Sequence, residues 1–145
     1  MRTVTLFRGW SLIGCYISMF IIGLLMSIYG PIVTIFQGKF GLTAVSVGAA
    51  LGVQSCGAVI GVLLAQPVLR KQGNRTTVMG ALLFTAVGSV TIAFSSQWTF
   101  VLIGTAIAGL GFGVIDSVIT QLVLIGSGDK GPRRTNIAHA WFGIG

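Results

Sequence analysis

The residue best suited to chemistry is Asp116, one of only two acidic residues in the 145-residue chain. It lies within a long apolar stretch, whereas Asp129 lies in a short charged segment. An ionised carboxylate inside a bilayer is costly, so such residues usually face a water-filled cavity. A carboxyl removed from water also holds its proton more firmly, so Asp116 could bind and release a proton near physiological pH. The alternative is structural: Asp116 bonds a neighbouring helix or Thr120, or lies near the cytoplasmic interface.

Polar residues near Asp116 extend this candidate site. In a helix, Gly109, Gly113, Asp116 and Thr120 share one face, which carries little bulk, one carboxyl and one hydroxyl, as expected for a substrate path. Each further polar residue, taken alone, is more typical of a contact between helices than of a contact with a ligand. The residues that could hydrogen-bond a polar solute are Thr120, Gln121, Gln54 and Tyr29.

Enzyme chemistry is not indicated. The chain has one histidine, His139, with no Ser-His-Asp set and no cluster of metal ligands. Cys15 and Cys56 both lie inside apolar stretches, as small buried hydrophobic residues do. The sequence therefore predicts no enzyme, no cofactor and no metal site.

The composition predicts an all-α integral membrane protein. Apolar residues make up 54% of the chain and charged residues 8%, against roughly a quarter charged in a soluble domain. No charge occurs from residue 76 to 115; one helix of that length would reach about 60 Å, twice the hydrocarbon thickness, so it must fold back near 95–98. The predicted spans are 10–36, with Pro31 kinking or fraying its outer end, 45–69, 76–95 and 99–125, and a fifth begins near 136.

The basic residues indicate the topology. Eight of them fall on one side of the predicted membrane and one, Lys39, on the other. Positive charge is retained in the cytoplasm during insertion, which predicts a multi-pass protein of the cell inner membrane with a cytoplasmic N-terminus. The charges lie in short loops without interleaved aromatic residues, so a nucleic-acid partner is not expected despite a pI near 10.5. The eight residues are Arg2, Arg8, Arg70, Lys71, Arg75, Lys130, Arg133 and Arg134.

Glycines at i, i+4 spacing predict close helix packing. Such pairs let helix backbones approach one another inside a membrane. They occur at Gly48/Gly52 and Gly57/Gly61 in the second span, and at Gly109/Gly113 in the fourth.

The segment 66–75 resembles the cytoplasmic loop motif G-x-L-A-D-R-x-G-R-K of the major facilitator superfamily. Lys71, Gly73 and Arg75 fit that motif in kind, while Gln66, Arg70 and Asn74 depart from it. The resemblance implies that Arg70, Lys71, Gly73 and Arg75 belong to a cytoplasmic gate between two transporter halves. Arg70 stands where the family usually has an aspartate, which puts that charge–dipole contact in doubt.

The segments 109–120 and 134–145 are similar to the fucose and glucose permease branch of the same superfamily. Asp116 matches the acid of that branch, Thr120 replaces its asparagine, and Asn136 and His139 lie at the start of the fifth span. Inverted repeats in the family place Gly30 opposite Asp116. The resemblance implies the first part of a six-helix transporter bundle.

The resulting hypothesis is a secondary transporter that moves a small polar, sugar-like solute by alternating access, in symport with protons through Asp116. Residues 1–145 would form an incomplete N-terminal transmembrane domain, whose remaining helices lie outside this chain. The alternatives are a drug or metabolite efflux transporter of the same superfamily, a dimeric four-span exporter, and an inactive remnant or membrane scaffold.

Overall fold

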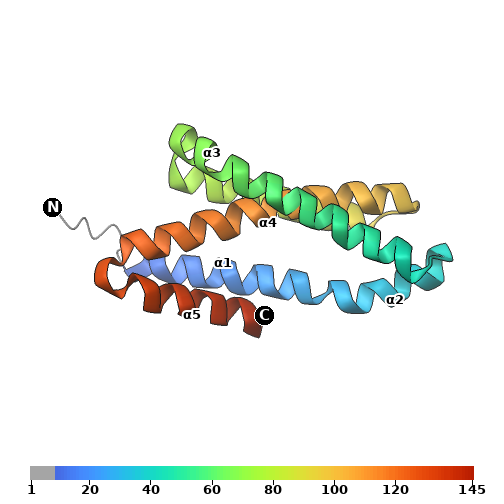
Figure 1. Ribbon diagram of the computed structural model, residues 1–145, viewed down its shortest axis with the longest axis horizontal. Helices are drawn as coiled ribbons and strands as arrows, with labels where there is room; N and C mark the ends of the chain where they lie inside the picture. Colours follow the sequence, from blue (N-terminus) through green and yellow to red (C-terminus); the bar gives the residue numbers. More distant parts are fainter. Residues whose placement is uncertain (1–8) are drawn as a thin grey trace. The chain divides into compact units, whose positions relative to one another are not determined.

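The computed structural model describes residues 9–145, and every regular element in this range is a helix, as predicted. Arg2 and Arg8 lie outside the described range. Within residues 9–145, three helices are long and apolar enough to cross a membrane: α1, α3 and α4. The elements are α1 (Gly9–Ser27), α2 (Tyr29–Phe40), α3 (Ala44–Ala93), α4 (Trp98–Gly126), the short 3-10 helix η1 (Gly128–Lys130) and α5 (Gly131–Ile144) (Figure 1).

The chain divides into two compact units. Unit 1 combines the residues up to Ile28 with Ile119–Gly145, and unit 2 is Tyr29–Val118. Unit 1 therefore contains α1, the last turns of α4, η1 and α5, while unit 2 contains α2, α3 and most of α4.

The predicted first span, 10–36, is interrupted. α1 ends at Ser27, and α2 begins at Tyr29. Pro31 lies in the first turn of α2; it has no N–H for the carbonyl of Ser27, and its ring clashes with that carbonyl in a continuous helix. The proline thus ends one helix and opens the next, which is a sharper effect than the predicted kink or fraying of the outer end.

α3 doubles back on itself at a single residue. Gly73 has φ 77° and ψ 168°, outside helical geometry, and it separates an arm at 44–72 from an arm at 74–93 (Figure 1). We call these the first and second arms of α3. The sequence predicted a loop from about 70 to 75, but helix covers the whole of it except Gly73. Only glycine adopts these angles without strain, so one residue replaces the expected loop.

The first arm of α3 packs against α4 through small residues. A Cβ on Gly57 would meet the carbonyl oxygen of Ala106, and one on Gly61 would meet that of Leu110. From the other side, a Cβ on Gly109 or Gly113 would meet the backbone of Gln54 or Ala58. Two of the three predicted glycine pairs therefore allow the backbone approach that was expected of them.

The second arm of α3 packs on another face of α4. Gly88 lies against Gly104 and Ala108, and Gly111 lies against Ala81 and Thr85. One stripe of the second arm is buried along its length. Its members recur every three or four residues, as the inward face of a helix does: Thr77, Ala81, Thr85, Gly88 and Ile92.

The third predicted glycine pair behaves differently. A Cβ on Gly48 or Gly52 would meet no atom within 4 Å among the described residues. Both positions are exposed. This pair therefore does not pack against a described helix, although its spacing equals that of the pairs that do.

The connection between α3 and α4 holds the end of α2. α4 begins at Trp98, close to the expected turn at 95–98. Lys39 donates a hydrogen bond to the carbonyl oxygen of Ser95 at 2.8 Å, and its Nζ lies 5.1 Å from the ring centroid of Phe40. The rings of Phe36, Phe40 and Trp98 lie 5.7–6.3 Å apart between centroids. Lys39 thus has a structural role that the charge pattern alone did not reveal.

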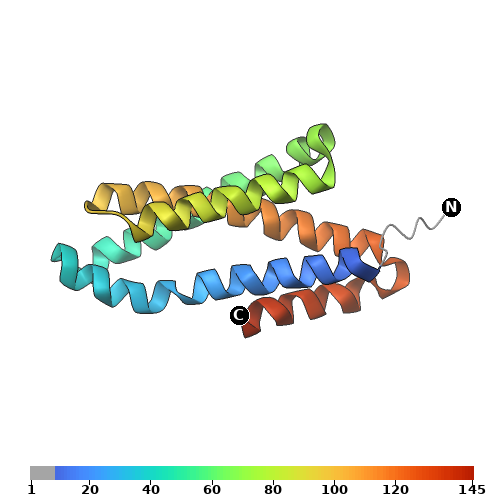
Figure 2. The same cartoon turned by 180° about the vertical axis from the view of Figure 1, so that it is seen from behind.

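In unit 1, α5 runs alongside α1, as both views show (Figure 2). Gly23 of α1 lies against the backbone of Phe142, and Phe20 makes an edge-on contact with Trp141, with centroids 6.0 Å apart. α5 begins at Gly131, five residues before the expected start of a fifth span. Pro132 lies in its first turn, where its missing N–H has no partner to lose.

Substituting Gly57 with alanine should destabilise the protein, because the added methyl overlaps the carbonyl of Ala106. Overpacking of this kind costs about 1–3 kcal/mol. Thermal unfolding in detergent, followed by far-ultraviolet circular dichroism, measures the loss. The matched control is Gly52→Ala on the same arm, where the methyl enters open space and should leave stability unchanged or raised. Equal melting temperatures for the two variants would contradict the packing described here.

Candidate functional site

Asp116 is half-buried and lies in the last third of α4. Its depth follows from the packing of unit 2. Gly111 faces Ala81 and Thr85 on the antiparallel second arm, so Asp116 is level with the first turns of that arm. Asp116 is level with a position five residues from Gly73, which at 1.5 Å per residue is about 7–8 Å along the helix axis. The carboxyl therefore lies about midway between the charged turn and the centre of the second arm, away from the depth at which burying a charge is least favourable.

The face of α4 that leads to Asp116 is not open along its whole length. Gly109 and Gly113 were expected to leave room for a substrate path, but the first arm of α3 fills that space with the backbones of Gln54 and Ala58. This expectation was wrong at these two positions, because the absence of a side chain let a helix approach instead. The polar part of the face starts only after Gly113, at Asp116.

The other candidates on α3, α2 and α4 have different surroundings. Gln54 is 9% exposed and belongs to the buried face of the first arm. Gln121 is half-buried, and both glutamines take part in interactions within the structure. Tyr29 is the first residue of α2, and its side chain lies outside what the structure describes.

In unit 1, the structure brings together two of the predicted site residues. The hydroxyl of Thr120 on α4 lies 3.5 Å from Nε2 of His139 on α5, at the limit of a hydrogen bond. Asn136, one turn before His139, is exposed. A second polar contact joins α5 to the residue that follows α4, since Nη1 of Arg134 donates to Oγ of Ser127 at 3.3 Å. The Arg134 contact was not anticipated from the sequence.

The predicted gate residues lie around the turn of α3. Arg70 and Lys71 end the first arm, Arg75 begins the second, and all three are exposed. The two arms meet at Gly73, so the three cations gather at one end of unit 2. No group of three or more His, Cys, Asp or Glu residues that could hold a metal occurs among the residues searched, 9–145.

Comparison with known proteins identifies the family. The family model of the Major Facilitator Superfamily matches residues 15–145. The chain belongs to the Major Facilitator Superfamily. No curated protein and no solved structure gave a significant match to it.

Membership of this superfamily assigns a class of activity to the geometry above. The superfamily consists of secondary transporters, and its members are not enzymes. A transporter lies in a lipid bilayer and binds a small-molecule substrate. Asp116 and the Thr120–His139 pair are therefore candidates for a translocation pathway, and the cations around Gly73 are candidates for its gating.

Replacing Gly73 with alanine should destabilise the turn. A residue with a Cβ pays roughly 1–3 kcal/mol for a backbone conformation of this type. The expected result is a lower melting temperature and faster tryptic cleavage at Arg70, Lys71 and Arg75. Gly80→Ala is the control, because it adds the same methyl to the second arm in open space at an ordinary φ. If Gly73→Ala cleaved and melted like Gly80→Ala, the left-handed turn would be disproved.

Proposed function

We propose that this chain contributes the first helices of a transporter that moves a small polar, sugar-like solute by alternating access, coupled to protons. Asp116 would be the proton-binding group that couples proton movement to transport. The single observation that carries this role is a half-buried carboxyl that is the one charged side chain of α4, a helix long and apolar enough to cross a membrane. Polar groups within a membrane-spanning helix are seldom kept without a function.

The depth of Asp116 supports proton exchange. A carboxyl about 7–8 Å from the charged turn is within reach of water that enters from that end. It is also one helical turn before Thr120, whose hydroxyl could donate to or accept from a solute hydroxyl. Thr120, Gln121, Gln54 and Tyr29 remain the proposed solute contacts, and Asn136 and His139 would add polar groups from α5.

We further propose that α1, each arm of α3, and α4 cross the membrane separately, with α5 starting a fifth crossing. The second arm alone extends about 30 Å, which equals the hydrocarbon thickness. The cations at Gly73 would then lie on the cytoplasmic side, with Lys39 on the opposite side. This arrangement follows from the retention of positive charge in the cytoplasm.

The proposed topology can be tested by labelling single cysteines with a membrane-impermeant maleimide in intact cells. In a background with Cys15→Ala and Cys56→Ala, a cysteine in place of Ser96 should react from outside. A cysteine in place of Gln72 should react only after the membrane is permeabilised. The reverse pattern would overturn the orientation, and reaction of both from one side would overturn the separate crossing of the second arm.

The proposed role of Asp116 is tested by transport in proteoliposomes that contain the protein at its full length. An imposed pH gradient should drive accumulation of a labelled sugar, and Asp116→Asn should lower that rate about tenfold or more. A tenfold loss corresponds to about 1.4 kcal/mol of barrier. Exchange of internal for external sugar, which needs no net proton movement, should persist in the variant.

Asp129→Asn is the matched control, because it removes the only other acidic side chain, which is exposed on η1. It should leave proton-driven accumulation unchanged. Undiminished accumulation with Asp116→Asn would rule out coupling through this residue. Loss of both accumulation and exchange would assign Asp116 to solute binding rather than to coupling.

A further inference from the structure

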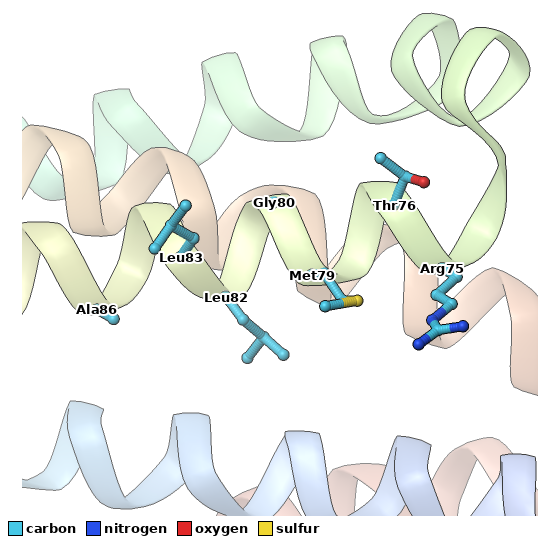
Figure 3. A pocket seen from close by; sticks show the side chains of 7 residues that line it. All are labelled: Arg75, Thr76, Met79, Gly80, Leu82, Leu83 and Ala86. Carbon is cyan, nitrogen blue, oxygen red and sulfur yellow. The ribbon is translucent and has the colours of Figure 1, made fainter.

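The second arm of α3 carries an open groove in which only Arg75 also belongs to the predicted gate. Its lining residues all come from that arm, and its volume is ≈ 870 Å³. Arg75, Met79 and Leu82 project from the same side of the helix (Figure 3). They are followed by Ala86, and the spacing i, i+4, i+7, i+11 makes one straight stripe along a helix. The stripe begins with a cation and continues with apolar side chains.

The end of the groove nearest Gly73 carries positive charge that no nearby acidic residue is shown to neutralise. Arg75 is exposed, and Arg70 and Lys71 lie just across the turn at Gly73. Unit 2 contains four basic residues, the three named here and Lys39, and its single acid is Asp116 on α4. An anion from outside unit 2 would therefore be attracted to this end.

The apolar part of the groove fits the depth of one lipid leaflet. From Arg75 to Ala86 the helix rises about 16 Å, and half of a 30 Å hydrocarbon core is about 15 Å. Met79 is 58% exposed and Leu83 is 64% exposed, so the side chains along this depth are available for contact. Gly80 leaves space beside them, since a Cβ there would meet nothing within 4 Å.

We propose that this groove binds an anionic phospholipid. The phosphate would accept hydrogen bonds from Arg75, and one acyl chain would lie along Met79, Leu82 and Ala86. A free phosphate would use the cations but would leave the apolar stripe uncovered. A packed helix would cover the stripe but would have to bring its own counter-charge for Arg75. A phospholipid supplies both the negative charge for Arg75 and the apolar chain that covers the stripe. This inference does not depend on which solute is transported.

The test is native mass spectrometry of the detergent-purified protein after incubation with equal amounts of phosphatidylglycerol and phosphatidylcholine. The wild type should retain phosphatidylglycerol preferentially. Arg75→Gln should lower its retention about fivefold, the factor that corresponds to the roughly 1 kcal/mol contributed per basic residue near an anionic surface. Lys130→Gln, which removes one exposed charge from η1, is the control and should have little effect.

A second variant tests the apolar part of the groove. Gly80→Leu keeps Arg75 and fills the space beside Met79, so it should also lower phosphatidylglycerol retention while leaving the melting temperature unchanged. Equal retention of the two lipids by the wild type would overturn the proposal. So would equal losses in Arg75→Gln and Lys130→Gln. Unchanged retention in Gly80→Leu would show that the lipid lies elsewhere and that another helix covers the groove.

Discussion

The close backbone contact between α4 and the two arms of α3 is the constraint on which unit 2 depends. Lipid chains are as apolar as leucine, so helices in a membrane gain little from hydrophobic burial and associate through tight packing. Here Gly57, Gly61, Gly109 and Gly113 remove the side chains from one contact. Gly88, Gly104 and Gly111 do the same for the other. α4 is therefore held on two faces, and this fixes the depth of everything it carries.

The packing of α4 determines the depth at which Asp116 lies along the helices. The register of α4 against the second arm places the carboxyl beyond the last close glycine contact and short of the charged turn. A carboxyl deeper in the packed region would lie against a helix backbone, and one further out would lie among the exposed cations. Between these limits the carboxyl is half-buried and lies about midway between the charged turn and the centre of the second arm. This depth is the basis of the coupling role that we propose for Asp116.

Gly73 determines where the basic residues of α3 lie. Because one residue reverses the chain, Arg70, Lys71 and Arg75 come to lie at one end of unit 2 instead of along an extended loop. The same compact turn can serve insertion, gating and lipid attraction, since all three need positive charge at a membrane surface. Arg70, which departs from the family pattern, adds to this positive charge where an aspartate would reduce it.

The sequence by itself determined the helical membrane class, the superfamily, the reversal near 95–98 and the small residues that pack. The length of the apolar stretches, the spacing of the charges and the motif residues are local properties, so they can be recognised in the sequence alone. Only the tertiary structure decided which glycines pack: Gly57 and Gly61 meet α4, whereas Gly48 and Gly52, with the same spacing, face open space. It also decided that Lys39 bonds Ser95 and that Thr120 approaches His139. Such contacts depend on which neighbouring helix each face meets. The spacing of residues along one helix shows only which residues share a face.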